Sequence, residues 1–409
     1  MLKNKCLKAK EAFAVLSSST GQVRNRAIAL MAESLEAEYE YILTENEKDI
    51  ADAALKRLSD AMTDRLRLTK ERIFAISASL RKVCMLPDPL GKGTVFTHLN
   101  GLTIQKVQVP LGLIAIIYES RPNVTVDAAA LCIKSGNTVI LRGGSEAINS
   151  NIALARVLRN ALSASDLPAD CIQIVEDTSR ETATELMKLN GYIDLLIPRG
   201  GKSLIQAVVA NSTIPVIETG EGNCHIYVDE SADTEMALNI INNAKTSRPS
   251  VCNAAESLLL HRSVAATLLP LIKARMPKVE LRGCAETLKI LPDITAATDE
   301  DFYTEYLDYI MSVKIVADVK EAVTHINEYN TKHSDAIITK NPDAAEYFTV
   351  NVDAAAVYVN ASTRFTDGEE FGFGAEIGIS TQKLHARGPM GLDELTTIKY
   401  KVIGNGQIR

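Results

Sequence analysis

The sequence predicts an α/β fold in which helices cover both faces of parallel β-sheets. Short, continuously apolar runs alternate with helical patterns from residue 111 to residue 209, and 46% of the chain is hydrophobic. Strands that are apolar on both faces are typical of parallel sheets buried between helices. With 409 residues, the chain is long enough for two or three domains.

The region before this alternation predicts helices and then a hairpin. Apolar residues recur at helical spacing over residues 7–80. Residues 87–91, with two prolines and a glycine, end that pattern. Residues 94–110 then contain two short β-like runs around Asn100-Gly101, a dipeptide that favours a hairpin turn.

The alternating region begins with a strand at residues 111–118. The expected elements after it are helix 126–135, ended by a glycine, strand 138–141, helix 149–162, strand 171–175, helix 182–189, strand 193–197 and helix 202–209. A second α/β block follows Glu221, with clear elements at 327–340 and 354–360. The tail, 396–403, predicts a lone strand that pairs with a distant segment or with another subunit.

Charge and cysteine content exclude several classes of protein. The net charge of −7 argues against a nucleic-acid partner. The longest apolar run, 111–118, is too short to cross a membrane, and no apolar signal core opens the chain, so a cytoplasmic location is expected. Seven cysteines without CxxC spacing or a neighbouring histidine pair argue against a disulfide framework and against a metal site.

Cys252 is the cysteine with the most reactive setting. Pro249 ends the preceding helix, and residues 253–255 can start a new one. A thiol at a helix N-terminus beside Arg248 would have a lowered pKa. Buried filler is the alternative for any cysteine, and it is the expected role of Cys132 in an apolar helix and of Cys171 at a strand start.

Three further segments could carry chemistry. Glu218 leaves the apolar run 214–217 for a Gly-x-Gly loop, where it is either a general base or the first solvated residue after a strand. Two strands, within 138–145 and 194–202, enter glycine turns that could present backbone N–H groups to phosphate. Neither is a complete dinucleotide or P-loop motif, and the glycines at 372–374 lack a preceding strand.

Taken together, these segments resemble the aldehyde dehydrogenase superfamily and, within it, the glutamate-5-semialdehyde dehydrogenase family. The matching segments are VPLGLIAIIYESRPNVT (109–125), KSGN (134–137), LRGGSEA (141–147), ETGEGNCH (218–225), RPSVCN (248–253) and FGFGAEIG (371–378). The resemblance implies two Rossmann-like domains and a small β oligomerisation element. It places an NADP-binding domain at 1–92 and 111–220, a catalytic domain at 221–390, and oligomerisation segments at 93–110 and 391–409.

The resemblance also implies a cofactor site. Arg142 matches a basic residue near the adenosine ribose, and Ser145 stands where NAD-preferring relatives often carry an acid. The cation of Arg142, with no carboxylate at position 145 to repel a phosphate, suits a 2′-phosphate. NADP(H) is therefore the expected cofactor. Gly200 and Gly201 match the pyrophosphate loop, and Glu305 matches a glutamate that contacts the nicotinamide ribose.

The implied catalytic residues surround the nucleophile, Cys252. Glu218 matches a glutamate of the catalytic pocket, although activating water would be wasteful with an acyl phosphate. Backbone N–H groups near Cys252 and Asn253 would hold the oxyanion. The superfamily often adds an asparagine there; Ser120 takes that position, with Asn123 three residues later, and either could serve.

The reaction implied is NADPH-dependent reduction of γ-glutamyl phosphate to glutamate 5-semialdehyde through a cysteine thioester, in proline biosynthesis. Arg121, Arg248 and Arg364 are candidate anchors for the substrate anions, with surface ion pairing as the alternative. The partners expected are this small molecule, further copies of the chain in a dimer or tetramer, and glutamate 5-kinase through functional coupling.

Three rival functions remain open. A cofactor-free cysteine hydrolase would need a histidine beside Cys252, and His225 is the best placed of the six histidines in sequence. A silent binding protein would be expected to lose Cys252 or Ser145, and both are present. A related reductase with a different acyl donor is disfavoured by the family match alone.

Overall fold

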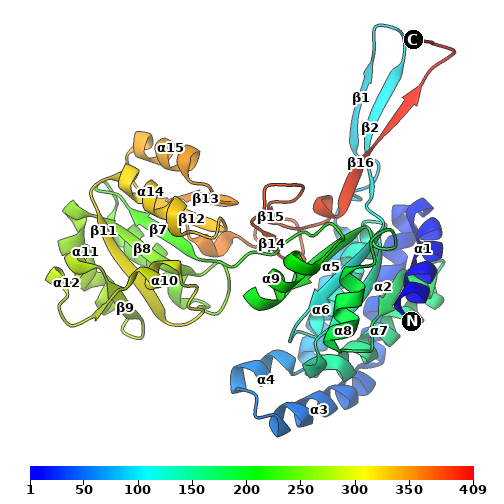
Figure 1. The fold of residues 1–409 in the computed structure, drawn as a ribbon, viewed down its shortest axis with the longest axis horizontal. Helices are drawn as coiled ribbons and strands as arrows, with labels where there is room; N and C mark the ends of the chain where they lie inside the picture. Colours follow the sequence, from blue (N-terminus) through cyan, green and yellow to red (C-terminus); the bar gives the residue numbers. More distant parts are fainter. The chain divides into compact units, whose positions relative to one another are not determined.

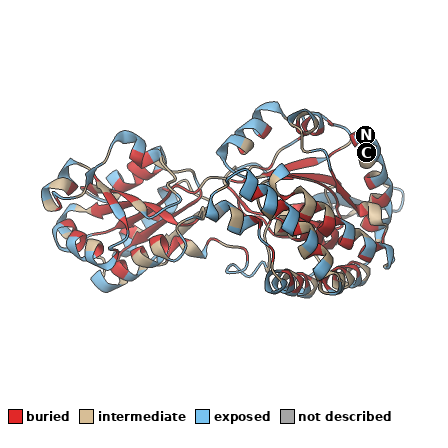
Figure 2. Ribbon diagram, turned by 90° about the horizontal axis from the view of Figure 1, so that it is seen from below, coloured by how far each residue is buried: buried red, intermediate tan, exposed pale blue. Residues whose placement is uncertain are grey.

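A computed structural model describes residues 1–409, apart from the side chain of Ala61. The chain divides into two compact units (Figures 1 and 2). Unit 1 comprises Met1–Thr219, Gly372–Gly378 and Met390–Arg409, and unit 2 comprises Gly220–Phe371 and Ile379–Pro389. In each unit the buried residues concentrate in the strands and on the helix sides that face them (Figure 2).

Unit 1 opens with the helices expected from the sequence. They are α1 (Leu2–Ser18), α2 (Gly21–Ala37), α3 (Tyr39–Leu55), α4 (Asp60–Leu66) and α5 (Lys70–Met85). The side chains of Thr20, Ser59 and Thr69 each accept the backbone N–H three residues further on, which fixes the starts of α2, α4 and α5.

A four-stranded parallel sheet forms the core of unit 1, in the order β5-β4-β3-β6. Its strands and helices are β3 (Leu113–Tyr118), α6 (Asn123–Lys134), β4 (Thr138–Gly143), η1 (Ser145–Ala147), α7 (Ile148–Ser163), η2 (Ala169–Cys171), β5 (Ile172–Ile174), α8 (Arg180–Met187), β6 (Leu195–Arg199) and α9 (Lys202–Asn211). Ala115 packs in one cluster with α1, α8 and α9, while its neighbours Ile114 and Ile116 are equally buried on the opposite face. The predicted alternation of strand and helix is therefore confirmed.

The predicted hairpin and tail strand form a separate antiparallel ribbon within unit 1. It consists of β1 (Gly93–Thr97), β2 (Thr103–Pro110) and β16 (Thr396–Ile403), in the order β1-β2-β16. The ribbon projects from the helices of its unit, and the C-terminus lies at its far end (Figure 1). Of the two expectations for the tail, pairing with a distant segment is confirmed: β16 runs along β2 of the same chain.

Unit 2 is built on a seven-stranded sheet, in the order β10-β9-β11-β8-β7-β12-β13, in which every pair is parallel. Its strands are β7 (Cys224–Val228), β8 (Ala255–His261), β9 (Glu280–Gly283), β10 (Thr295–Ala296), β11 (Ile310–Val316), β12 (Ser334–Ile338) and β13 (Ala356–Val359). Its helices are α10 (Thr234–Thr246), α11 (Arg262–Arg275), α12 (Ala285–Ile290), α13 (Asp299–Tyr303), α14 (Val319–Tyr329), α15 (Pro342–Asn351) and η3 (Thr363–Phe365).

Both faces of this sheet are covered. Ile226 and Val228 of β7 pack in a cluster with α10 and α11, whereas Tyr227 packs in a second cluster with α14 and α15. The short pair β14 (Ile379–Ser380) and β15 (Gly388–Pro389) also belongs to unit 2, and η4 (Asp393–Leu395) precedes β16 in unit 1.

Two local predictions were wrong. No helix starts at residues 253–255, because Ala255 opens β8, whose buried residues pair with β7 on one side and β11 on the other. The expected strand at 214–217 is reduced to a single bridge between Val216 and Leu196. In addition, the segment 327–340 contains the end of α14 and all of β12 rather than one element.

Candidate active site

Cys252 lies in a tight turn between α10 and β8 of unit 2. The helix ends at Thr246, ahead of Pro249 as predicted, and the Ala254 N–H donates to the Val251 carbonyl over 3.0 Å. We call residues 251–254 the cysteine turn. The Cys252 side chain is half-buried.

The carbonyl oxygens of the cysteine turn are held from several sides. Besides the Val251 carbonyl, the Cys252 carbonyl accepts a hydrogen bond from the Cys224 thiol over 3.2 Å. The Asn253 carbonyl accepts one from the Thr363 hydroxyl over 2.8 Å. Three successive peptide groups are thus fixed by donors around them.

The side chain of Asn253 adds a fourth connection. Its amide nitrogen donates to the carbonyls of Thr366 (2.9 Å) and Arg364 (3.3 Å). Its amide oxygen is buried and has no hydrogen-bond partner among the described residues. Because both side-chain N–H groups point at carbonyls, the oxyanion donors that this turn can offer are its main-chain N–H groups.

The positive charge near Cys252 comes from arginines. The Arg364 Nε donates to the Ser247 hydroxyl over 3.1 Å. Burial lowers the pKa of Arg364, the neighbouring Arg248 lowers it further, and Cys252 acts in the opposite direction. Of the two predicted causes of an electropositive setting, the nearby Arg248 is present, but the helix start after Cys252 was wrong.

Most of the other cysteines are unsuited to be nucleophiles. All seven are free thiols. Burial raises the pKa of Cys6 to about 11 and that of Cys171 to about 12, and it raises the pKa of Cys132 further. The core roles predicted for Cys132 and Cys171 are confirmed by their complete burial. Cys284 differs: burial raises its pKa, but hydrogen bonds from Thr287 and the backbone outweigh burial and lower it.

Glu305 supports the backbone behind the cysteine turn. Its carboxylate accepts the Gly222 N–H over 2.7 Å. A Cβ on Gly222 would lie only 1.4 Å from the Cys252 carbonyl oxygen, so no other residue fits there without moving the turn. Glu305 thus contacts Gly222, and Gly222 in turn lies against the carbonyl group of the candidate nucleophile, Cys252.

The loop that contains Gly222 is itself tightly held. The Thr331 hydroxyl donates to the Glu221 carbonyl over 2.6 Å and accepts the Asn223 N–H over 3.0 Å. The Asn223 side chain donates to the carbonyls of Phe302 and Tyr329, over 2.7 and 2.9 Å. This loop is consequently a fixed wall rather than a flexible segment.

In unit 1, Arg142 lies at the end of β4. Its Nη2 donates to the carbonyls of Thr178 (2.6 Å) and Ser179 (3.3 Å). Its Nε is buried and has no hydrogen-bond partner in the described part of the chain, and burial lowers its pKa. Ser145 is exposed at the start of η1. Arg142 therefore places a half-buried guanidinium at the end of β4.

The glycine loop between β6 and α9 already binds a carboxylate. The Gly201 N–H donates to Glu119 Oε2 over 3.0 Å. A Cβ on Gly200 would come within 2.4 Å of the same oxygen, while one on Gly201 would meet open space. The Gly201 N–H can therefore donate to an anionic oxygen, and a phosphate of a dinucleotide would fit this backbone geometry.

Ser120 and Asn123 also contact carboxylates. Ser120 has a left-handed backbone (φ 52°), and its N–H and hydroxyl both donate to Glu146, over 2.6 and 3.0 Å. The Asn123 amide donates to Asp127 over 2.9 Å, and burial raises the pKa of Asp127 to about 6. Both candidates for the oxyanion site thus have their donors engaged within unit 1.

The remaining candidates divide between the two units. Half-buried Glu218 precedes Thr219, whose hydroxyl donates to the Pro198 carbonyl over 3.0 Å, so Glu218 lies near the carboxyl end of β6 in the unit 1 sheet. Arg121 is exposed in unit 1 and Arg248 is exposed in unit 2. Within unit 1, Ser120 and Gly200 follow β3 and β6, Arg142 lies at the end of β4, and β3 pairs with both β4 and β6. Within unit 2, Arg248 and Arg364 lie near Cys252 in the cysteine turn, and Glu305 binds the Gly222 N–H behind it.

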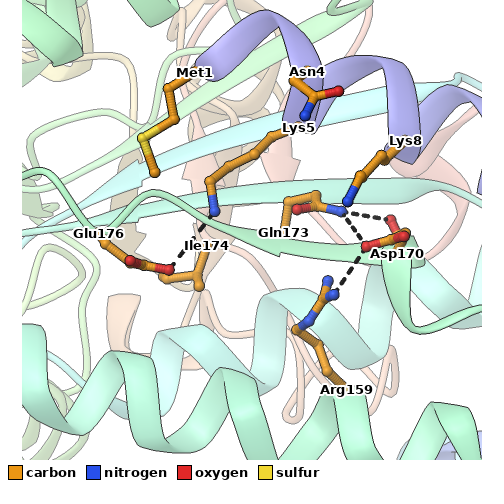
Figure 3. A pocket seen from close by; sticks show the side chains of 9 residues that line it. All are labelled: Met1, Asn4, Lys5, Lys8, Arg159, Asp170, Gln173, Ile174 and Glu176. Atoms are coloured by element: carbon orange, nitrogen blue, oxygen red, sulfur yellow. Dashed lines mark hydrogen bonds and ion pairs between the residues drawn. The ribbon is translucent and has the colours of Figure 1, made fainter.

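A pocket of about 350 Å³ lies elsewhere in unit 1 (Figure 3). Two ion pairs, Lys5–Glu176 at 3.7 Å and Arg159–Asp170 at 2.9 Å, link its charged side chains. Its lining residues are Met1, Asn4, Lys5, Lys8, Arg159, Asp170, Gln173, Ile174 and Glu176. None of the residues predicted from the sequence is among them.

The sequence did not predict the residues that form hydrogen bonds or close contacts with the candidate site residues. Cys224 and Gly222 lie in a segment used to recognise the family, but nothing in their spacing indicates a contact with the Cys252 carbonyl. Glu119 and Glu146 sit in other such segments, where a charged residue after a strand could have been noted. Thr363 has no sequence signal, because it meets the turn only through the folding of unit 2.

Comparison with known proteins decides the family. The aldehyde dehydrogenase family matches residues 2–308 of the chain. The chain belongs to the aldehyde dehydrogenase family. Like other members, it is an oxidoreductase that uses a nicotinamide cofactor. Among the described residues of this family member, no helix has the length and apolar character to span a bilayer.

Its relatives within the family are similar over almost their whole length. The chain is 59% identical over 405 residues to gamma-glutamyl phosphate reductase of Clostridium perfringens, covering 98% of both chains. It is 57% identical to that of Petrotoga mobilis, covering 99% of this chain and 98% of the relative. The crystal structure of gamma-glutamyl phosphate reductase from Thermotoga maritima matches with a TM-score of 0.98 at 49% identity, covering 99% of each chain.

More distant members of the family share the fold. An acetylating aldehyde dehydrogenase from Geobacillus thermoglucosidasius is 17% identical and matches with a TM-score of 0.72, covering 100% of this chain and 97% of that structure. The predicted aldehyde dehydrogenase-like fold is confirmed by these matches.

Proposed function

We propose that the protein reduces γ-glutamyl phosphate to L-glutamate 5-semialdehyde with NADPH, releasing phosphate, in proline biosynthesis. The observation that carries the chemistry is the cysteine turn, in which a half-buried thiol lies beside two arginines on a fixed backbone. The choice of substrate rests on the near-complete similarity to gamma-glutamyl phosphate reductases.

The first step is acyl transfer to the protein. The Cys252 thiolate attacks the γ-carbonyl carbon, the carbon–sulfur bond forms, and the bond to the phosphate oxygen breaks. Phosphate leaves and a thioester remains on Cys252. The main-chain N–H groups of Cys252 and Asn253 stabilise the oxyanion, each by roughly 3–4 kcal/mol as in other acyl transfers.

Residues of unit 1 are proposed to hold NADPH, and Glu305 of unit 2 stays a separate candidate, implied by the family resemblance, for contact with the nicotinamide ribose. The Gly201 N–H, at the start of α9, suits the pyrophosphate, and the half-buried guanidinium of Arg142 suits the 2′-phosphate. Ser145 adds no negative charge there, which supports NADPH over NADH. When bound, NADPH supplies the hydride that turns the thioester into a thiohemiacetal. The collapse of this group returns the Cys252 thiol and releases the semialdehyde.

The substrate anions require cations. Arg364 and Arg248 lie with Cys252 in unit 2 and are proposed to bind the phosphate or the α-carboxylate, with Arg121 as a further candidate. Glu218 stays a candidate general base, and Ser120 and Asn123 stay candidates for completing the oxyanion site. A different acyl donor is the alternative substrate.

The ribbon is proposed to join copies of the chain into a dimer or tetramer. Its outer strands, β1 and β16, each pair on one side only, and they expose the apolar residues Val95, Phe96, Ile398, Tyr400, Val402 and Ile403. The mass in solution, measured by light scattering, tests this assembly. A cytoplasmic location and coupling to glutamate 5-kinase are further predictions.

The decisive experiment follows NADP⁺ reduction in the presence of glutamate 5-semialdehyde and phosphate. Wild-type protein should reduce NADP⁺ only when phosphate is present, and Cys252→Ala should lose at least about 10³-fold in kcat. Cys284→Ala is the matched control, because it removes a thiol whose pKa is lowered by hydrogen bonds, and it should keep full activity.

Either of two results would contradict the proposal. Turnover that persists in Cys252→Ala removes the nucleophile assignment. No turnover in wild-type protein that still binds NADPH removes the substrate, and a screen of other acyl donors would then identify the alternative.

A further inference from the structure

Cys224 lies directly behind the candidate nucleophile, and its side chain is completely buried. Its sulfur is 3.2 Å from the Cys252 carbonyl oxygen. The same oxygen abuts Gly222, where a Cβ would come within 1.4 Å of it. One carbonyl group is thereby enclosed by a thiol on one side and by a glycine backbone on the other.

An irregularity in the sheet lies beside Cys224. Cys224 opens β7 and pairs with Ala255, whereas the next residue, His225, pairs with Ser257. The register shift leaves Glu256 of β8 without a partner, so the extra residue lies in the strand that follows the cysteine turn, opposite Cys224.

The protonation state of the Cys224 thiol suits a hydrogen-bond donor and does not suit a nucleophile. Burial raises its pKa well above 9.0, so the thiol keeps its proton at neutral pH. His333 Nδ1 is 3.8 Å from the sulfur, but burial lowers the pKa of His333 to about 4, so the ring is neutral and does not stabilise a thiolate. The Cys252 carbonyl is the closer acceptor for the S–H proton.

We propose that Cys224 is a positioning residue that fixes the peptide group between Cys252 and Asn253. The chain has trans peptide bonds throughout the described residues, and in a planar trans peptide the C=O and N–H groups point in opposite directions. Holding the Cys252 carbonyl toward Cys224 therefore directs the Asn253 N–H the other way, as an oxyanion donor. This inference rests on the proposed role of Cys252.

The proposal separates two reactions of the same thiol. Acylation by p-nitrophenyl acetate forms a bond between the Cys252 sulfur and the acetyl carbon, passes through an oxyanion, and expels p-nitrophenolate. Alkylation by iodoacetamide forms a sulfur–carbon bond with loss of iodide and has no oxyanion. Loss of the Cys224 donor should impair the first reaction and spare the second.

The experiment compares wild-type protein with Cys224→Ala and Cys224→Ser. The burst of p-nitrophenolate measures acylation, and mass spectrometry of the Cys252 peptide measures alkylation. In Cys224→Ala, acylation should slow about tenfold, the size of one hydrogen bond, with alkylation within about twofold of wild type. Cys224→Ser keeps a donor and should restore acylation to within about threefold of wild type. Cys132→Ala, another fully buried cysteine, should leave both rates unchanged.

The outcomes distinguish this proposal from the proposed function. A wild-type protein without a burst, or one labelled at another cysteine, overturns the role of Cys252 and this inference with it. A normal burst in both wild type and Cys224→Ala overturns only the positioning role. So does a parallel loss of acylation and alkylation, or a serine variant as slow as the alanine variant.

Discussion

The two units hold their candidate site residues in different ways. In unit 2, the cysteine turn is fixed through its carbonyl oxygens, by the Cys224 thiol and the Thr363 hydroxyl among others. In unit 1, the loops after the strands are held through N–H groups, which donate to the carboxylates of Glu119 and Glu146.

This difference follows the chemistry proposed for each unit. An anionic ligand cannot replace a donor bound to a carbonyl, so the cysteine turn keeps its shape when substrate binds. A ligand phosphate can replace a carboxylate on a backbone N–H, because both present anionic oxygens. The backbone of the cysteine turn is thus preorganised. The proposed nucleotide loops instead bind the carboxylates of Glu119 and Glu146, which a ligand phosphate can replace.

The largest effect expected is a loss of folding stability at acid pH, and it comes from His333. The pKa of His333 is lowered to about 4 by burial, so as pH falls below about 6.5 the unfolded chain binds a proton that the folded protein excludes. Folding stability should therefore fall with pH, by about 2 kcal/mol at pH 5 from this residue. His333→Asn should remove this part of the pH dependence.

Comparing the variant with wild type at pH 8 and pH 5 isolates His333. Burial raises the pKa of Glu256 to about 7, and that group acts in the opposite direction, but it is present in both proteins and cancels. Hydrogen–deuterium exchange of β7 and β12 peptides provides the measurement. An equal change with pH in both proteins would contradict the prediction.

A smaller effect should come from Arg142. Arg142→Ala removes the cation proposed for the 2′-phosphate and should weaken NADPH binding about tenfold, with NADH binding changed by less than about twofold. The fluorescence of bound NADPH gives the affinity. Lys8→Ala, which removes a cation from the pocket of Figure 3, is the control and should change neither affinity. Equal losses for both nucleotides would mean that Arg142 does not select the phosphate.

The smallest effect expected concerns Glu119. Glu119→Gln keeps the size of the side chain but weakens the acceptor on the Gly201 N–H, so NADPH should bind about threefold more tightly. Glu176→Gln in the other pocket is the matched control. If Glu119→Gln binds NADPH more weakly, the carboxylate supports the nucleotide loop instead of competing with the ligand.

The sequence predicted the fold better than the surroundings of the candidate site. Continuous apolar strands and their spacing specify local structure, which is why β3 and β16 agree with the prediction. The failure at residues 253–255 has a physical reason: sheet pairing on both sides of β8 outweighs the helix propensity of two alanines.

Contacts between distant residues could not be predicted in the same way. The bond from Cys224 to the Cys252 carbonyl joins residues 28 positions apart, and the one from Thr363 depends on a segment more than a hundred residues away. The periodicity of the sequence indicates neither of these two contacts. Cys252 itself was singled out by its flanking residues, although a helix was wrongly given as the cause of its setting.

The ribbon has a consequence for how the protein is made. Strand β2 is synthesised early, but its neighbour β16 follows nearly three hundred residues later. Throughout that interval one edge of β2 is unpaired, while unit 2 can be completed first by residues up to Pro389. On the ribosome, the later unit should therefore mature before the earlier one, and the nascent chain must be protected from pairing of the β2 edge with other chains.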